Sequence, residues 1–350
     1  MTSKVMWAAL ALAAMSSSAI GTAAAEENFT AVGWGGSWNE AYDQGVFQPF
    51  TKESGVKVIV DEWEGELAKL RAQVESNAIV YDFVSVEAPQ LEIGCAEGLF
   101  AKLPEAIYAQ KDAYLPGTIH ECGLASDTWA TVMVYDGNKI KDGPQSWADF
   151  WDVGKFPGKR GMLGQAQYTL ENAMMAAGVA PADVYTELRK PGGVDKAFAM
   201  LDKIKPNVVW WTSSTKAMQN LSAGEVVMTD LYNARVTSEN EKNKSNYVIA
   251  WNAGFFYGTD MWAVVKGAPH QAEAEKFLDF FAKPENQAGF PKLYAYGVGH
   301  KQVSQYLTPE QLDRLPTSEK NLAHGAVYDT EFWAENKEAL EQRFQAWLAQ

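Results

Sequence analysis

Short apolar runs alternate with helical patterns through the first part of the chain. The runs at 29–33, 56–60 and 81–86 are rich in β-branched and aromatic residues, which favour half-buried strands. Between them, 39–53 and 64–76 carry apolar residues at helical spacing. Regular alternation of strand and helix predicts a parallel, wound α/β sheet.

The same alternation returns further along. Apolar runs at 128–134, 158–163 and 226–230 predict strands, and 170–177 and 215–223 predict helices. A single hydrophobic core rarely covers a chain of 350 residues. The pattern therefore predicts two α/β lobes.

The stretch 247–266 combines apolar, aromatic and acidic positions. Apolar runs at 248–251 and 261–265 predict two strands, and the aromatic segment 255–257 and Asp260 lie between them. Aromatic rings beside a lone carboxylate suit a pocket for the carbon chain and ammonium of a small amine. A core strand with a turn aspartate would produce the same pattern, so both interpretations stay open.

Several polar and aromatic residues follow predicted strands. Trp34, Ser37 and Trp38 follow the first strand, and Glu87 follows the third. Ligands of open α/β sheets bind beyond the carboxyl ends of the strands, so these residues are expected at one rim. Glu87 is either a surface acid at a strand end or the partner of an amine.

Two features in the second lobe suit a carboxylate. Trp211 and Ser213 end an apolar run just before the helix predicted at 215–223, whose N-terminus is an anion site. Arg235 follows another strand, and a guanidinium clamps a carboxylate with two hydrogen bonds. Solvated helix arginines are the commoner case, so this alternative stays open.

Residues 1–25 are expected to be a signal peptide. Lys4 supplies a positive charge, an apolar core follows at 5–15, and small residues precede Glu26. This core is too short to span a bilayer, and no later run reaches the roughly 18 apolar residues of a spanning helix. We therefore expect an exported, soluble protein that does not insert into the membrane.

The chain is acidic. Its formal charge of −14 becomes −15 without Lys4, because 1–25 holds no acidic residue. Nucleic acid is excluded as a partner, since phosphates demand a basic surface. An acidic surface mildly favours the approach of cations, although it also serves simple solubility.

The chain has two cysteines, Cys95 and Cys122. In an exported protein, such a pair predicts a disulfide, with two free buried thiols as the alternative. Two isolated thiols lack the ligand count of a structural metal site.

Signatures of hydrolases and phosphate-binding loops are missing from the sequence. His300 follows Tyr294 and Tyr296, a faint likeness to tyrosine-rich ferric sites, but no two tyrosines are adjacent. We expect no catalytic centre, metal or cofactor. Ferric-ion binding and an enzyme on the same fold are the less favoured alternatives.

Several segments resemble, in their sequence and in their order along the chain, segments of the spermidine/putrescine-type periplasmic solute-binding proteins of ABC transporters. The resemblance covers nearly the whole chain after residue 25. The matching segments are FTKESGVKV at 50–58, YDFV at 81–84, SWADFW at 146–151, YNAR at 232–235 and DMWAV at 260–264.

The resemblance implies a type II-like periplasmic binding protein with ligand in a cleft between two lobes. Crossover strands near 130–135 and 260–265 would form the hinge, and closure would present a surface to an inner-membrane permease. The implied lobes are 26–130 plus 261–303 for the N-terminal lobe and 131–260 plus 304–350 for the C-terminal lobe.

The resemblance also implies the nature of the site. In polyamine-binding members, aromatic walls surround the methylene chain and carboxylates bind each ammonium. The residues at or near matching positions are Trp34, Tyr232, Tyr257, Asp260 and Tyr296.

Departures from the polyamine pattern favour a different ligand. Gln165, Gln167 and Tyr168 stand where polyamine binders place acids, and Glu87 and Arg235 are further differences. An inward guanidinium would repel a second ammonium, so γ-aminobutyrate or a similar ω-amino acid is the ligand that matches best. We expect the protein to be a monomer. Putrescine or spermidine is the alternative. The predicted ligand-binding residues are Trp34, Ser37, Trp38, Glu87, Tyr168, Trp211, Ser213, Tyr232, Arg235, Tyr257, Asp260 and Tyr296.

Overall fold

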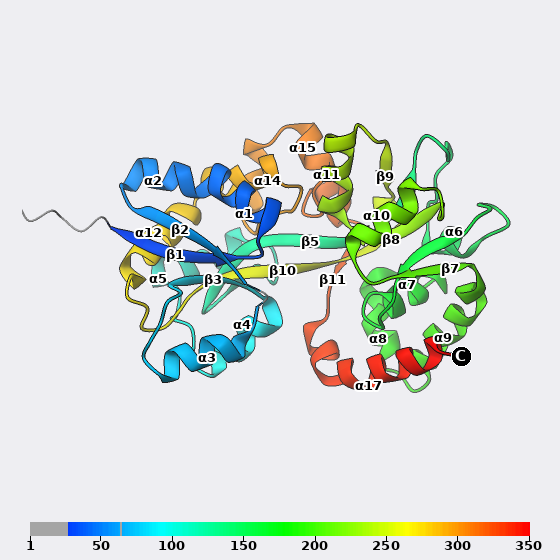
Figure 1. Ribbon diagram of the computed structural model, residues 1–350, viewed down its shortest axis with the longest axis horizontal. Helices are drawn as coiled ribbons and strands as arrows, with labels where there is room; N and C mark the ends of the chain where they lie inside the picture. The colour runs from blue at the N-terminus through cyan, green and yellow to red at the C-terminus, as the bar shows by residue number, and fades with distance from the viewer. Residues whose placement is uncertain (1–26, 64) are drawn as a thin grey trace, which may run out of the picture.

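The computed structural model describes residues 27–63 and 65–350, which form two α/β lobes beside each other (Figure 1). The predicted signal peptide, 1–25, lies outside the described residues. In the described part of the chain, no helix is long and apolar enough to cross a membrane.

One sheet runs through both lobes. Its main order is β2-β1-β3-β10-β5-β8-β6-β7, with β11 beside β10 and with β4 and β9 beside β5. β1 pairs in parallel with β2 and β3, and β6 pairs in parallel with β7 and β8, as the strand–helix alternation predicts. The strand bounds are β1 (Asn28–Gly33), β2 (Lys57–Glu62), β3 (Phe83–Glu87), β4 (Ile119–His120), β5 (Gly123–Asp136), β6 (Arg160–Leu163), β7 (Val208–Trp211), β8 (Met228–Tyr232), β9 (Tyr247–Ile249), β10 (Phe255–Val264) and β11 (Gly325–Val327).

The long strands β5 and β10 cross from one lobe to the other (Figure 1). They pair antiparallel, and the register shifts just after Asp260, which lies opposite Asp127. Most residues of both strands are buried, because each strand passes through the cores of two lobes. The predicted two-lobe fold is confirmed.

The aromatic segment 255–257 belongs to β10, so the prediction of two strands with a pocket segment between them is wrong at this point. Gly258 makes room on β10 for the side chain of its partner on β5. A Cβ on Gly258 would lie 2.2 Å from Cζ2 of Trp129, its register partner on β5. The glycine therefore leaves room for the Trp129 indole to lie against β10.

The first lobe has an aromatic core over its part of the sheet. Phe83 stacks on Trp262 of β10 with ring centroids 4.6 Å apart, and Phe29 packs against Phe277 of α12. The helices of this lobe are α1 (Gly36–Tyr42), α2 (Gln48–Ser54), α3 (Leu67–Glu75), α4 (Ala88–Ala96), α5 (Glu105–Tyr108), α12 (Gln271–Phe281), α13 (Pro284–Gln287) and α14 (Gly289–Leu293), with a π-helical turn at Asp43–Phe47 joining α1 to α2.

The second lobe has its own core. Trp147 and Phe150 of α6 are fully buried there, where Trp147 Nε1 donates to the Gly254 carbonyl. The helices of this lobe are α6 (Trp147–Trp151), α7 (Thr169–Ala176), α8 (Val184–Leu188), α9 (Gly193–Ile204), α10 (Ser214–Ser222), α11 (Asn233–Asn243) and α17 (Thr330–Leu348). The connecting segments hold α15 (Pro309–Asp313), α16 (Glu319–Leu322) and 3-10 turns at Lys111–Ala113, Pro181–Asp183, Lys205–Asn207, Trp251–Ala253 and Lys301–Tyr306.

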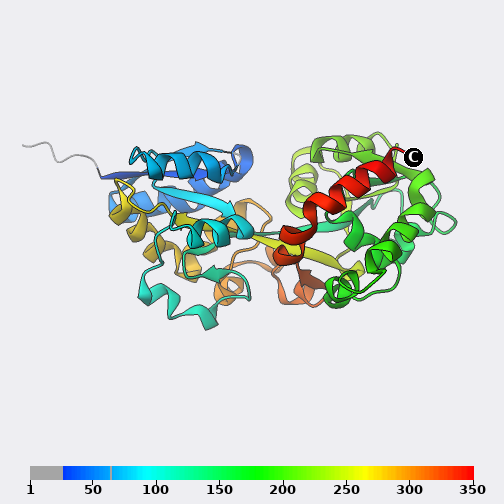
Figure 2. The ribbon, with the colours of Figure 1, turned by 90° about the horizontal axis from the view of Figure 1, so that it is seen from below.

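The C-terminal tail divides between the lobes. Helix α17 lies along the second lobe (Figure 2), where Phe332 and Phe344 are buried in its core. Leu315 instead belongs to the core cluster of the first lobe, which also contains Phe29 and Phe277. The predicted lobe boundaries stay a prediction.

Glu171 of α7 ties α17 to the second lobe. Its Oε1 accepts from Trp333 Nε1 at 2.5 Å and from the Tyr185 hydroxyl at 2.8 Å, and the side chain is fully buried. Burial raises the pKa of Glu171 from 4.5 to about 7, because the ionised form loses its hydration.

We predict that Glu171→Gln changes how stability depends on pH. The unfolded carboxyl ionises near pH 4.5 and the folded one near 7, so the folded state holds the extra proton between these values. Relative to the variant, wild type should lose a few kcal/mol of unfolding free energy, on the order of 1.4 per pH unit, as pH rises through this window. Urea unfolding at several pH values measures this difference. A constant difference across the window would contradict the assignment.

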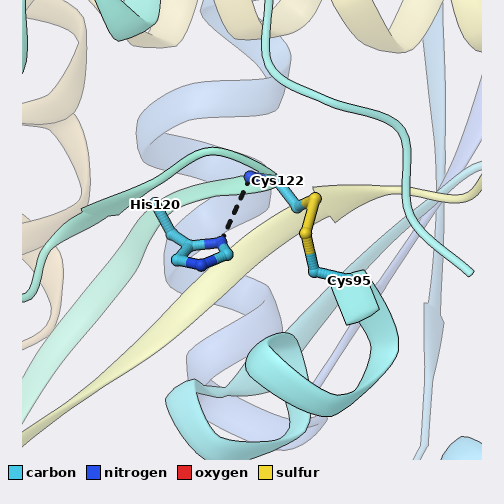
Figure 3. A group of neighbouring side chains, drawn as sticks. All are labelled: Cys95, His120 and Cys122. Carbon is cyan, nitrogen blue, oxygen red and sulfur yellow. Dashed lines mark hydrogen bonds between the residues drawn. A yellow bond between two sulfur atoms is a disulfide. The ribbon is translucent and has the colours of Figure 1, made fainter. Parts of the chain in front are cut away.

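The two cysteines form the predicted disulfide. Cys95 at the end of α4 is bonded to Cys122, which lies between β4 and β5 (Figure 3). The bond closes a loop with a sequence separation of 27 residues, which stabilises the fold by about 3 to 4 kcal/mol in the chain-entropy account.

His120 lies beside this disulfide (Figure 3). Its Nδ1 accepts from the Cys122 backbone N–H at 3.2 Å. Among the described residues, Cys95, His120 and Cys122 are the only group of three or more His, Cys, Asp or Glu side chains close enough to share a metal ion. Because the disulfide engages both sulfurs, this group has no thiolate for a metal.

Candidate functional site

A cavity of about 340 Å³ lies between the lobes beside the hinge strands. In the first lobe its walls come from the turn after β1, the end of β3 and the segment after α14. In the second lobe they come from the residue before α7, the end of β8, α10 and α11, and the hinge strands β5 and β10 contribute as well. The lining residues are Trp34, Gly35, Gly36, Ser37, Trp38, Glu87, Trp129, Tyr168, Ser214, Tyr232, Arg235, Asp260, Tyr294 and Tyr296.

Nine of the twelve predicted ligand-binding residues line this cavity. Residues far apart in sequence meet here because the carboxyl ends of β1, β3 and β8 all point toward the cleft. That these side chains contact a ligand stays a prediction. The nine residues are Trp34, Ser37, Trp38, Glu87, Tyr168, Tyr232, Arg235, Asp260 and Tyr296.

The other three predicted residues do not line the cavity. Trp211 is buried and its Nε1 donates to Asp230 at 2.9 Å, so its indole serves the core. Ser213 caps α10 by accepting from the Lys216 backbone N–H, and the neighbouring Ser214 lines the cavity instead. Tyr257 lies in the core of the second lobe.

Three side chains of the wall were not among the predicted ligand-binding residues, namely Trp129, Ser214 and Tyr294. Trp129 lies in a run that reads as core strand, and only its pairing opposite Gly258 shows which face it occupies. Tyr294 follows α14, where the chain has no strand end to mark it. The only sequence feature that could have indicated Tyr294 is its closeness to Tyr296, which was predicted to bind the ligand.

Asp260 lies at the floor of the cavity, and a second carboxylate, Asp127, is its partner in the pairing of β10 with β5. Asp260 is 7% exposed and accepts from Trp129 Nε1 at 3.1 Å, and Asp127 behind it is fully buried and accepts from Trp38 Nε1 at 2.8 Å. Oδ1 of Asp127 has no hydrogen-bond partner among the described residues. At least one carboxylate oxygen in this part of the structure can therefore accept a further hydrogen bond.

The environment of these carboxylates favours a cation. Burial raises the pKa of Asp127 to about 7. Burial, with the nearby charges of Asp127 and Glu87, raises the pKa of Asp260 well above its usual range. A carboxylate that is costly to ionise alone gains most from an ammonium beside it.

The walls next to Asp260 are aromatic. The Trp129 ring meets Tyr168 and Tyr232 edge-on, with centroids 5.8 and 5.7 Å away. Tyr168 precedes α7 with φ 67°, a conformation that costs energy in a residue with a side chain. The Tyr168 side chain lines the cavity, where its ring forms part of the aromatic wall.

Arg235 supplies a positive charge on the wall formed by α11. Its side chain is exposed, and no carboxylate of the described residues pairs with it. Its charge lowers the pKa of the Tyr294 hydroxyl against the effect of burial, which places the guanidinium near that ring. Arg235 is therefore available to an anionic group in the cleft.

Asn233 fixes the position of α11. Its Oδ1 accepts from the Ala130 backbone N–H of β5 at 3.0 Å, and its Nδ2 donates to the Ala295 carbonyl. These bonds join the start of α11 to a hinge strand and to the loop that carries Tyr294. The segment YNAR thus places Tyr232 and Arg235 at the cleft while Asn233 stays buried.

Glu87 lies at the end of β3, where it precedes α4. Its backbone N–H donates to Gln90 Oε1 at 3.0 Å, which fixes the start of that helix. The Glu87 side chain accepts from the Gln90 backbone N–H in return, the residue is exposed, and partial burial of its carboxyl raises the pKa. It forms a second acidic position beside the cavity.

His300 does not join this site. It is buried against Tyr114, with ring centroids 4.9 Å apart, and its Nδ1 accepts from the Gln302 backbone N–H. The likeness to a ferric site therefore lacks its histidine, although Tyr294 and Tyr296 do line the cavity.

Two α/β lobes joined by crossing strands, with a cavity of aromatic walls and unpaired charges between them, are typical of a solute-binding protein. The chain belongs to the bacterial extracellular solute-binding protein family, whose model matches residues 45–317. Proteins of this family bind solutes, so the prediction of a carrier rather than an enzyme is confirmed.

Individual proteins and solved structures are similar to this chain over most of its length. The γ-aminobutyric acid-binding protein of Pseudomonas aeruginosa is 43% identical over 326 residues, covering 93% of this chain and 92% of that protein. Among solved structures, an ABC transporter substrate-binding protein from Bradyrhizobium japonicum is 30% identical with a TM-score of 0.81, covering 92% and 99% of the two chains. A γ-aminobutyrate receptor structure is 25% identical with a TM-score of 0.77, covering 92% and 98%.

Proposed function

We propose that this protein is the periplasmic substrate-binding component of an ABC importer and that it captures γ-aminobutyrate or a similar ω-amino acid. The observation that carries the proposal is the presence of Arg235 and Asp260 in the lining of one cavity. The relative from Pseudomonas aeruginosa and the receptor structure, both named for γ-aminobutyrate, support it.

The two charges suit opposite ends of the ligand. Asp260, with aromatic rings around it, would accept the ammonium, since rings and a carboxylate both favour a cation. Arg235 would clamp the carboxylate through two parallel hydrogen bonds, and Ser37 and Ser214 offer hydroxyls in the same cavity. An ω-amino acid has its charges separated by a methylene chain, as this arrangement requires.

A diamine is the competing ligand, because Glu87 and Asp260 are two acidic positions. Its second ammonium would meet the field of Arg235. Two unit charges 4 Å apart interact by about 4 kcal/mol at an intermediate dielectric, and here the sign is repulsive. The guanidinium therefore favours a zwitterion over putrescine or spermidine.

Calorimetry of the purified protein without residues 1–25 tests the proposal. We expect γ-aminobutyrate to bind with a Kd at least tenfold below those of putrescine and spermidine. Tighter binding of a diamine, or no binding of γ-aminobutyrate, would contradict it.

We also propose the oligomeric state, the lobe boundaries and the membrane partner of the protein. A monomer would bind its ligand between the N-terminal lobe, 26–130 plus 261–303, and the C-terminal lobe, 131–260 plus 304–350. Closure of the cleft would give the shape that an inner-membrane permease accepts. Family membership and relatives that act as ABC substrate-binding proteins support this setting.

A further inference from the structure

A second cavity of about 360 Å³ lies between the lobes, and Glu87 lines both cavities. Helix α4, which begins directly after Glu87, and helix α17 of the other lobe touch each other beside this second cavity. Lys337 of α17 lines the second cavity as its only basic residue among the described part of the chain. Glu87 thus has an ammonium on the opposite lobe.

The neighbours of Lys337 leave Glu87 as its natural partner. The other acid of the second cavity, Glu92, already lies 3.8 Å from His120 Nε2. Lys337 forms no ion pair among the described residues. Its charge is the one that lowers the pKa of Glu87 against the raising effect of burial.

We propose that Lys337 determines ligand specificity by acting as the built-in counterion of Glu87, so that the cleft retains one free carboxylate for a ligand ammonium. The inference rests on the proposed function. Because α4 and α17 belong to opposite lobes and touch each other, an ion pair of Lys337 with Glu87 would join the lobes beside the cleft. Asp260 is then the acid that remains for the ligand.

The balance of charge follows from this pairing. Glu87 with Lys337 is neutral, and Asp260 with Arg235 matches the two ends of a zwitterion. Without Lys337 the cleft gains one unpaired negative charge, at the position where a second ammonium of a diamine would lie. Rejection of diamines thus has two parts, repulsion by Arg235 and occupation of Glu87 by Lys337.

The test is calorimetry of Lys337→Gln against putrescine and γ-aminobutyrate. We expect the Kd for putrescine to fall at least tenfold, while the Kd for γ-aminobutyrate changes less than threefold. Lys203→Gln on α9, exposed on the same lobe, is the control for net charge and should change neither value. Lys337→Arg keeps the charge and should keep the rejection of putrescine.

A double variant shows whether Lys337 acts through Glu87. Adding Glu87→Gln to Lys337→Gln should return the putrescine Kd to the wild-type value. An unchanged putrescine Kd in Lys337→Gln, or a loss of γ-aminobutyrate binding in it, would overturn the inference. Wild type is titrated with γ-aminobutyrate in parallel. Absence of binding there would contradict the proposed function, whereas the variants test only the role of Lys337.

Discussion

Asp260→Asn weakens γ-aminobutyrate binding by about 2 to 5 kcal/mol in our account, which is a 30-fold to several-thousand-fold rise in Kd. The substitution removes the charge that meets the ligand ammonium. It keeps the shape of the side chain, and its amide oxygen still accepts from Trp129 Nε1, 3.1 Å from the carboxylate in wild type. The loss is therefore expected in binding rather than in folding.

Calorimetry and thermal unfolding separate these two effects. The melting temperature should not fall, because burial of an ionised Asp260 is itself unfavourable. Glu75→Gln on α3, an exposed acid remote from the cleft, should leave affinity unchanged. Retention of wild-type affinity by Asp260→Asn would remove this carboxylate from the proposed site.

Arg235→Ala is expected to weaken γ-aminobutyrate binding by about 2 to 5 kcal/mol, since the ligand carboxylate loses its charged partner in a closed cleft. Stability should change by no more than about 0.5 kcal/mol, because Arg235 is exposed and pairs with no carboxylate of the described residues. Calorimetry and urea unfolding measure the two effects on the same preparation.

Arg235→Lys provides the matched comparison. It keeps the positive charge but loses the two parallel hydrogen bonds, so it should recover part of the affinity that Arg235→Ala loses. Putrescine should bind Arg235→Ala more tightly than wild type, because a repulsive charge is gone. Equal γ-aminobutyrate affinities in all three proteins would mean that the carboxylate does not meet Arg235.

Many residues that line the cavity can be predicted from the sequence because they follow predicted strands. Trp38, Glu87 and Arg235 each follow a predicted strand, and the parallel sheet brings such ends to one cleft. Asp260 was found through its aromatic neighbours, although these lie in a strand and Tyr257 faces the core. The prediction of Asp260 thus rested partly on a wrong local structure.

The failures have a common physical cause. Trp211 and Ser213 satisfy the same local pattern as a ligand contact, but their partners, Asp230 and the start of α10, are set by tertiary packing. Trp129 was missed because the face of a buried strand depends on its register, here fixed by Gly258. A single sequence carries little information on register or on which neighbour covers a side chain.

The measurement that tests the central claim most directly is a crystal structure of the protein with γ-aminobutyrate. The account predicts a closed cleft in which the ligand carboxylate lies within hydrogen-bond distance of the Arg235 guanidinium, with the ammonium at Asp260 between the rings of Trp129 and Tyr232. A ligand bound in the opposite direction, or outside this cavity, would contradict the account.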